Sequence, residues 1–302
     1  MPVRAPARLL AAWLAACALA ANGGAEEAAR EPKIEKLGTL PPALAESSGV
    51  AASRTQPGVL WTHNDSGGGA RLFALSAAGE LRKVYYLIRG RAVDWEDIAV
   101  GACPAREGAC LFVADTGDNL EDRRSVTVWI LDEPQVPAGS TDAITSIAEV
   151  KTLRVRYADG PHDVEAIAFD PDGNLLLISK GQRSPIRVYR VDRAKLSNEE
   201  AGADLVDLDT IAPRAWLGGW ITGAALSPAK TRLVVRTYTE LYFYRFGAKG
   251  ELVPDGPPCE LGFVEPQGEG VDFLDEDTLV LTSESRGGRN GELLRVRCPR
   301  GG

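Results

Sequence analysis

The sequence is poor in the residues that build transition-metal centres and nucleophilic active sites. Among 302 residues there are only 2 histidines, His63 and His162, and no C-x-x-C pair, so a zinc site is disfavoured. No G-x-S-x-G segment is present, which argues against a serine nucleophile on a sharp strand-to-helix turn. The glycine run at 67–69 has no Walker pattern and no following helix, so it does not predict a phosphate-binding loop.

Positive charge and helical periodicity are scarce as well. The formal net charge is −8, which argues against a nucleic-acid partner because such a partner needs a basic face. Only 193–200 has the pattern of a short helical turn. In contrast, 32 glycines, 19 prolines and an apolar fraction of 44% are typical of a globular domain made of many short strands and tight turns.

The N-terminus has the features of a targeting segment. Arg4 and Arg8 precede an apolar run at 9–20 that is too short to span a bilayer, and small residues follow it. Residues 1–20 are therefore predicted to be a signal peptide.

Two processing routes are open for this segment. Ala18-Leu19-Ala20 fits ordinary cleavage, whereas Leu14-Ala15-Ala16-Cys17 resembles a bacterial lipobox in which Cys17 is lipidated. Residues 21–32 are expected to form a linker and 33–302 a single domain. The protein is thus expected to be exported, either as a periplasmic protein or as an outer-membrane or cell-surface lipoprotein that touches the membrane only through its anchor.

The remaining cysteines support export. Besides Cys17 there are four, an even number: Cys103, Cys110, Cys259 and Cys298. Cys103 and Cys110 flank a short loop and are expected to close it, and the other two would tie the end of the chain to the preceding segment. The alternative is four free thiols, which is less favoured in an oxidising compartment.

A short acidic signature recurs along the chain and predicts a repeat architecture. Five segments start with, or align with, an acidic opening, at intervals of 50, 69, 57 and 47 residues. Their aligned positions are Glu46, Glu96, Glu165, Thr222 and Glu269. Each opening is followed by an apolar strand ending in polar residues, at 59–65, 111–118, 175–180, 233–238 and 279–284. A third strand with alternating polarity then follows, at 71–75, 126–130, 186–191, 241–246 and 293–297.

A fourth strand follows only the first four of these units, at 83–88, 151–157, 205–211 and 259–264. The segment 33–40 is therefore expected to supply the outer strand of the last unit and to close a ring, which removes open sheet edges. The predicted fold is an all-β, five-bladed propeller of four-stranded blades. The alternative is six blades, with a degenerate one hidden in the insertion at 134–148, which could also be partly helical.

In a propeller the innermost strand begins, and the second strand ends, at the same face of the central channel. The recurring polar signatures fall at those two places, so this face should be rich in polar groups. The residues expected at this channel mouth are Glu46, His63, Asn64, Asp65, Asp94, Glu96, Asp115, Asp118, Asn119, Asp163, Glu165, Lys180, Arg236, Glu269 and Glu284.

Converging carboxylates repel one another unless a cation compensates them. Calcium is the expected cation because it takes six to eight oxygen ligands from carboxylates, amides and carbonyls. The predicted ligands are Asp65, Glu96, Asp115, Asp118, Asn119 and Glu165. The alternative is that these side chains satisfy backbone N–H groups in loops between blades.

Three residues are candidates for catalysis at this mouth. Lys180 and Arg236 lie where the other units place acids, and they could orient an anionic substrate or simply pair with neighbouring glutamates. His63 is a possible general base, although loop histidines are more often inert.

Four motifs, in this order, resemble a group of secreted bacterial β-propeller proteins. They are W-T-H-N-D-S-G at 61–67, D-W-E-D-I-A at 94–99, A-D-T-G-D-N at 114–119 and D-x-E-A at 163–166. The third motif is followed by an arginine, which is Arg123 or Arg124. More distantly, the chain is similar to the phytase-like and gluconolactonase/paraoxonase-like calcium-dependent propellers. That resemblance implies acidic and Asn side chains that hold Ca²⁺, which polarises a phosphate or a lactone. The chain departs from those families in two ways. It has five predicted blades, whereas they have six, and it lacks a set of Lys and Arg residues that could bind a polyphosphate.

Two hypotheses follow from the sequence. The first is an exported calcium-binding propeller, expected to be monomeric, with a hydrolase-like site for a lactone, phosphoester or ester at the channel mouth. The second is a non-catalytic scaffold of the cell envelope that binds a small anionic molecule or an envelope protein.

Overall fold

The computed structural model describes residues 31–66, 68–88, 90–139, 144–147, 149–207, 210–213 and 219–299. These residues form 22 strands and two short 3-10 helices, Pro42–Leu44 and Arg193–Lys195, so the fold is all-β as predicted. The predicted signal peptide, Cys17 and nearly all of the predicted linker lie outside the described residues. None of the described helices has the length and apolar character needed to cross a bilayer.

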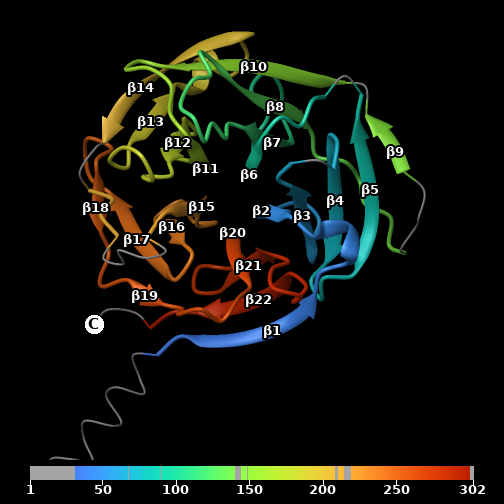
Figure 1. The fold of residues 1–302 in the computed structure, drawn as a ribbon. Coiled ribbons are helices and arrows are strands. Elements are labelled where there is room, and N and C mark those ends of the chain that lie inside the picture. Colours follow the sequence, from blue (N-terminus) through green and yellow to red (C-terminus); the bar gives the residue numbers. More distant parts are fainter. Residues whose placement is uncertain are drawn as a thin grey trace, which may run out of the picture.

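The innermost strands stand around a central axis, and the chain runs outward from each of them (Figure 1). Each innermost strand contacts its neighbours around the ring. They are β2 (Ser47–Ala52), β6 (Trp95–Ala102), β11 (Val164–Phe169), β15 (Ile221–Leu226) and β20 (Gln267–Phe273). The second strands are β3 (Val59–Asn64), β7 (Ala109–Asp115), β12 (Leu175–Ser179), β16 (Leu233–Thr237) and β21 (Leu279–Glu284). The third strands are β4 (Arg71–Ser76), β8 (Val126–Asp132), β13 (Val188–Val191), β17 (Glu240–Phe246) and β22 (Glu292–Arg297).

These strands, which match the predicted segments closely, pair antiparallel in the order inner, second, third. The outer strands complete four hydrogen-bonded sheets, ordered β2-β3-β4-β5-β9, β11-β12-β13-β14-β10-β8-β7-β6, β15-β16-β17-β18 and β1-β22-β21-β20. The eight-stranded sheet is joined at its centre by a parallel pairing between β10 (Val150–Tyr157) and β14 (Glu200–Asp207). Radial antiparallel sheets around one axis make the molecule a β-propeller.

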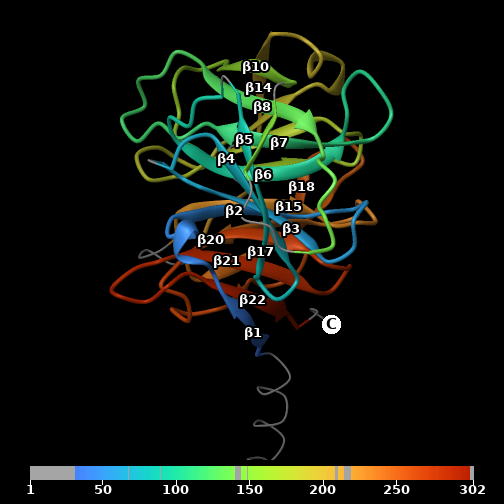
Figure 2. The ribbon, with the colours of Figure 1, turned by 90° about the vertical axis from the view of Figure 1, so that its right-hand side faces the viewer.

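The predicted closing strand is confirmed. Strand β1 (Lys33–Thr39) pairs antiparallel with β22, so the first strand of the described chain lies beside the last one (Figure 2). A disulfide between Cys259 and Cys298 fastens the same region. The pairing covers the edge that β22 would otherwise expose.

Several outer strands differ from the prediction. Strand β14 begins at Glu200, five residues before the predicted start, because it extends beside β10. The predicted strand at 259–264 is reduced to β19 (Cys259–Glu260), and β18 (Leu252–Pro254) pairs with the rest of β17. The insertion at 134–148 holds no helix in its described part but a strand, β9 (Ile144–Ile147), parallel to β5 (Leu81–Leu87). Outer strands are half-exposed, so their hydrophobic pattern locates them poorly.

Packing between neighbouring units of inner, second and third strands forms the core. Five hydrophobic clusters lie between these units, and each draws residues from two neighbouring ones. Trp61 and Trp95, both with no exposed surface, pack in one of them. Innermost and second strands are buried on both sides, which explains why the second strands are almost continuous apolar runs in the sequence.

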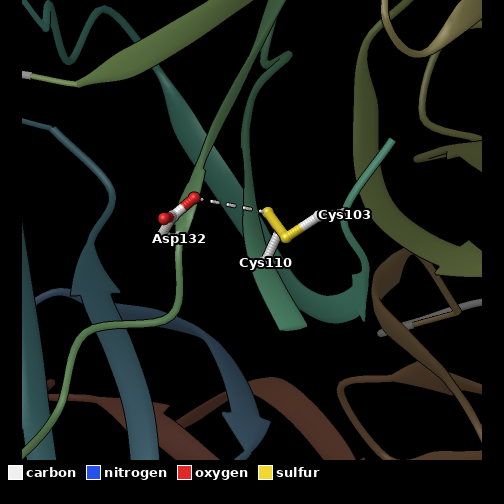
Figure 3. Close-up of side chains that lie close together, drawn as sticks. All are labelled: Cys103, Cys110 and Asp132. Carbon is white, nitrogen blue, oxygen red and sulfur yellow. Dashed lines mark hydrogen bonds between the residues drawn. A yellow bond between two sulfur atoms is a disulfide. The ribbon is translucent and has the colours of Figure 1, made fainter. Parts of the chain in front are cut away.

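Both expected disulfides are present, which is typical of proteins in an oxidising compartment. Cys103 and Cys110 close the loop between β6 and β7, and Asp132 lies beside them with Oδ1 4.0 Å from the Cys110 sulfur (Figure 3). These three residues lie close enough to suggest a metal site. A disulfide has no thiolate to offer a cation, so we do not assign one there.

Candidate functional site

Backbone hydrogen bonds between consecutive units bring the two polar signatures together. The N–H of Trp95, at the start of β6, donates to the carbonyl of Asp65 at 3.0 Å. In the same way, Val164 N–H donates to Thr116 O at 3.4 Å, and Ile221 N–H donates to Lys180 O at 3.0 Å. These three second-strand ends, of β3, β7 and β12, are thereby fixed against the beginnings of β6, β11 and β15 at one mouth of the channel.

Five carboxylates gather at this mouth. Asp65, Asp94 and Glu96 form one group that could hold a metal ion, and Glu96, Asp163 and Glu165 form a second. Within each group, one oxygen atom from each residue lies within 4.8 Å of the others, and Glu96 belongs to both groups. We call these five residues the acidic cluster. Asp94 and Asp163 belong to it in addition to Asp65, Glu96 and Glu165 from the predicted ligand set.

The cluster is built around a glycine that leaves room for its oxygen atoms. A Cβ added at Gly117 would lie 2.1 Å from Glu96 Oε1 and 2.5 Å from Asp94 Oδ2. Any side chain at this position would therefore displace the two carboxylates. The sequence signal for it was the glycine inside the motif A-D-T-G-D-N.

Two oxygen atoms of the cluster, Asp65 Oδ1 and Asp163 Oδ2, are buried without a hydrogen bond from the described residues. Asp163 is 4% exposed, and its Oδ1 accepts the backbone N–H of Asp118 at 2.7 Å. Its Oδ2 receives no hydrogen bond from the described residues; the nearest cation, Lys180 Nζ, is 3.9 Å away. A buried carboxylate oxygen left in this state costs free energy unless it binds a proton or a cation.

Burial and mutual repulsion shift the pKa values of Asp65, Glu96, Asp163 and Glu165 upward. Burial, together with Asp94 and Glu284, raises the pKa of Asp65 to about 8. The pKa of Glu96 lies well above its usual range because of burial and the charges of Glu165, Asp65 and Asp94. Burial raises the pKa of Glu165 to about 7 although Lys180 opposes it. At neutral pH the cluster therefore holds protons unless a cation replaces them.

Lys180 is the cation of the cluster. It stands at the end of β12, with Nζ 2.6 Å from Glu165 Oε1. Burial acts to lower the pKa of Lys180, but Glu165, Asp163 and Glu96 outweigh it and raise the pKa above its usual value. This one ammonium lies next to Glu165, Asp163 and Glu96, so it compensates only part of the charge of the five carboxylates.

A second acidic arc lies beside the first. Burial and Glu46 raise the pKa of Glu284 to about 7, and burial and Glu284 raise that of Glu269 well above its usual range. Glu269 accepts a hydrogen bond from Gln267 Nε2 at 2.8 Å. Tyr238, which the sequence interpretation had not singled out, lies next to this arc: burial and then the charge of Glu269 raise its pKa.

Asn64 and Glu46 have structural contacts at the rim of the mouth. Asn64 Oδ1 accepts the backbone N–H of Glu46 at 3.2 Å, and its Nδ2 donates to Ala43 O at 2.9 Å. Glu46 is exposed. Thr222, at the fourth aligned position, donates its hydroxyl to Glu269 O at 3.1 Å and so links β15 to β20.

The remaining three predicted calcium ligands are placed differently from the acidic cluster. Asp115 Oδ1 lies 3.1 Å from Arg123 Nη2 and also accepts the backbone N–H of Asp94. Asp118 accepts the backbone N–H groups of Asp122 and Arg123 at 3.1 and 2.8 Å. Asn119 is exposed. The contacts of both Asp residues match the structural alternative, in which loop carboxylates satisfy backbone N–H groups.

Arg236 is enclosed in the protein. Its side chain has no exposed surface and forms an ion pair with Glu265, and its Nη1 donates to Gly270 O at 2.5 Å and to Thr282 O at 3.0 Å. The pairing of β20 with β21 is irregular between Gly268 and Val271, and such a bulge leaves backbone groups without their ladder partners. The guanidinium donates hydrogen bonds to carbonyl groups at this bulge. Glu265 was not identified from the sequence because its partner lies in another unit.

Both histidines are enclosed as well. His63 has no exposed surface and contacts Trp95 edge-on, with ring centroids 5.5 Å apart. Burial lowers its pKa to about 4, so the ring is neutral at neutral pH. His162 is stacked on Tyr189, with centroids 5.5 Å apart, and its Nε2 lies 3.1 Å from Asp159 Oδ1.

No protein-family model and no curated protein matches this chain. Several solved structures do match, but their TM-scores lie below 0.5, so they carry no argument about this protein. A PQQ-bound aldose sugar dehydrogenase from Streptomyces coelicolor is 14% identical with a TM-score of 0.49, covering 89% of this chain and 98% of its own. A gluconolactonase from Xanthomonas campestris is 16% identical with a TM-score of 0.44, covering 91% and 93%. A streptogramin B lyase is 8% identical with a TM-score of 0.41, covering 88% and 98%.

Proposed function

We propose that this protein is an exported, calcium-binding propeller whose acidic channel mouth acts on a small anionic substrate by hydrolysis. The observation that carries the proposal is the acidic cluster, with five carboxylates, one ammonium and a buried oxygen of Asp163 without a hydrogen bond. We also propose that the strands group into five blades, with the eight-stranded sheet counted as two blades that meet where β10 and β14 run parallel.

The spacing of the oxygen atoms supports a hard cation of the size of calcium. Two ligands on opposite sides of Ca²⁺ lie about 4.8 Å apart, since each Ca–O distance is about 2.4 Å. The oxygen atoms of each three-residue group lie within 4.8 Å of one another. The proposed ligands are Asp65, Asp94, Glu96, Asp163 and Glu165. All five are carboxylates. Calcium prefers oxygen donors of this kind, whereas softer metals prefer sulfur or nitrogen ligands.

Bound calcium would also replace the protons that the acidic cluster otherwise holds at neutral pH. Its two positive charges would let Asp65 and Glu96 ionise at neutral pH, which burial and repulsion otherwise oppose. A cation at this position would polarise a carbonyl or phosphoryl oxygen of a bound lactone, phosphoester or ester. Lys180, which is partly exposed, would orient the anionic group of the substrate.

Stability in the presence of calcium tests the metal site. Calcium at about 100 times its Kd should stabilise the protein by about 2.7 kcal/mol. For a domain of this length that raises Tm by about 5 °C, and magnesium at the same concentration should do less because it requires a strict octahedron. Glu96→Gln should abolish the shift, whereas the exposed Glu107→Gln serves as the matched control and should keep it. Equal melting with and without calcium would remove the metal site from the proposal.

An activity screen tests the chemistry. Calcium-loaded protein is offered lactones, phosphoesters and aryl esters, and turnover should fall at least about tenfold in Lys180→Gln if this residue orients the substrate. The Lys249→Gln variant, altered at an exposed turn, should be unaffected.

A non-catalytic envelope scaffold is the second candidate function. The burial of both histidines favours it, because neither offers a solvent-accessible general base at the mouth. Turnover of none of the three substrate classes, together with an intact calcium shift, would favour the scaffold over the hydrolase. Mass spectrometry of the mature N-terminus would decide between signal-peptide cleavage and lipidation at Cys17.

A further inference from the structure

The channel has a second mouth, and a cavity of about 650 Å³ lies there. Its position follows from the direction of the innermost strands. In β6, Glu96 belongs to the acidic cluster, whereas the cavity is lined by the residues from Ile98 to Ala102. In β11, Glu165 is in the cluster and Ala168 lines the cavity. The cavity therefore lies at the opposite end of the same strands.

A closed layer separates the two ends. Asp97, between Glu96 and Ile98, has no exposed surface and accepts the backbone N–H of Ile98 at 2.8 Å and of Ile167 at 2.9 Å. The backbone N–H of Ala224 also donates a hydrogen bond to the Asp97 carboxylate, so this one side chain connects β6, β11 and β15 across the axis.

Glycines in the same layer bring the remaining innermost strands together. A Cβ at Gly49 would lie 2.6 Å from the Ile98 nitrogen, and one at Gly270 would lie 2.6 Å from the Val50 nitrogen. The strands are in backbone contact at this level. The cavity is therefore a site of its own and not an extension of the acidic cluster.

The wall of the cavity is mostly apolar and made of small side chains. The innermost strands contribute, among others, Val50, Ile98, Ala168, Ala224 and Val271. A volume of about 650 Å³ falls within the range of about 300–1,000 Å³ that small-molecule sites occupy. Such a wall fits the apolar part of a ligand, and it offers few polar groups to an inorganic ion or a sugar.

Half of the six charged side chains that line the cavity have partners among the described residues. Asp272 forms an ion pair with Arg54 at 2.8 Å. Asp170 accepts N–H groups of Asp172 and Asn174 in its own turn, at 3.0 and 2.9 Å. The exposed Asp172 is the third acid at the rim.

Two cations at this rim, Arg193 and Lys230, form no ion pair with any described residue. They belong to neighbouring units. Arg193 packs along the β11–β12 turn, where its Cδ lies 3.3 Å from the Cβ position of Gly173, and Lys230 lies in the β15–β16 turn.

Lys230 also adopts a backbone conformation that is unfavourable for lysine. Its φ is +60°, in the left-handed region, and its N–H donates to Ser227 O at 2.8 Å. The corresponding turn of the preceding unit has Gly173 in that place, with φ +85° and an N–H bond to Asp170 O at 3.0 Å. A glycine would meet the same requirement without strain. The lysine is therefore explained better by its charge at the rim than by the turn.

We propose that this cavity binds a small amphipathic monocarboxylate, with its apolar chain in the channel and its carboxylate at Lys230 and Arg193. The apolar wall supplies most of the binding free energy, and the two cations select an anion and fix its orientation. The site is separate from the calcium site, so either proposal can fail alone.

Calorimetric titration of the whole protein with decanoate, kept below its micelle concentration, tests the proposal. Decanoate should bind at one site per chain, and decanol should bind about three- to tenfold more weakly because it lacks the charge. Lys230→Gly should weaken decanoate by a similar factor without loss of stability, since it relieves the backbone strain. Lys249→Gly, in an exposed turn away from the cavity, is the matched control and should bind like the wild type.

A second variant tests the location. Ala102 is exposed at the rim, so Ala102→Trp should fold and should obstruct the mouth, reducing affinity at least about tenfold. Ala248→Trp, on the exposed β17–β18 turn, should leave binding unchanged. Absence of decanoate binding to the wild type, equal affinities for decanoate and decanol, or full affinity in Ala102→Trp would each overturn the proposal.

Discussion

The buried ion pair between Arg236 and Glu265 gives the sharpest prediction about stability. Both side chains are almost completely enclosed, at 0% and 2% exposure. Replacing Glu265 by Leu would leave the guanidinium buried without its counter-charge, because a leucine of similar size admits no water to replace it. Breaking a buried pair in this way costs about 3–5 kcal/mol.

The partner substitution has a different balance. Arg236→Met would leave Glu265 buried and would also remove the donors to Gly270 O and Thr282 O. We expect this variant to cost at least as much as Glu265→Leu. In the double variant no charge is left unpaired, so the combined loss should fall short of the sum of the single losses by about 2 kcal/mol or more.

Urea unfolding followed by tryptophan fluorescence measures these free energies, and scanning calorimetry gives Tm. At about 2 °C per kcal/mol for a domain of this length, the single variant Glu265→Leu should lower Tm by about 6–10 °C. Glu200→Leu removes a partner from the exposed pair with Arg154, where both side chains are about half exposed, and should cost less than about 1 kcal/mol. A loss in Glu265→Leu no larger than in Glu200→Leu, or strictly additive losses in the double variant, would refute the reasoning.

Four further outcomes are expected. Replacing Cys259 and Cys298 by serine should cost about 4 kcal/mol in urea unfolding, against about 2.5 for the other disulfide, because the sequence separations are 39 and 7. Burial and Glu46 raise the pKa of Glu284 from 4.5 to about 7. Protonated Glu284 therefore contributes its full stabilisation to the folded state below pH 4.5, and this contribution is lost as the pH rises through 7. In EDTA the Tm should fall between about pH 5 and 8, and it should fall less steeply in Glu284→Gln. Gly117→Ala should cost about 1–3 kcal/mol and abolish the calcium shift in Tm, because its Cβ would lie 2.1 Å from a carboxylate oxygen. Lys230→Gly should raise the stability by up to about 1 kcal/mol, and a loss instead would mean that the lysine packs in the native state.

Much of the fold could be predicted because it depends on local patterns that repeat. The second strands are apolar runs since both of their faces are buried between sheets, and Lys33–Thr39 was recognisable as a closing strand because the last unit had no outer strand. The four cysteines paired as their spacing indicated. The outer strands were located less well, because half-exposed strands have little hydrophobic contrast.

The sequence by itself determined where the innermost strands begin and where the second strands end, because the repeat of acidic openings and apolar runs marks those positions. Only the tertiary structure decided what each side chain does there. Asp115 and Asp163 are both predicted at the channel mouth, yet Arg123 neutralises Asp115, whereas one oxygen of Asp163 has no hydrogen bond from the described residues. Lys180 follows the end of β12, whereas Arg236 lies within β16 and is enclosed beside a bulge in the neighbouring unit. The partners of these groups come from other units tens of residues away, and contacts at that separation leave no local pattern in a single sequence.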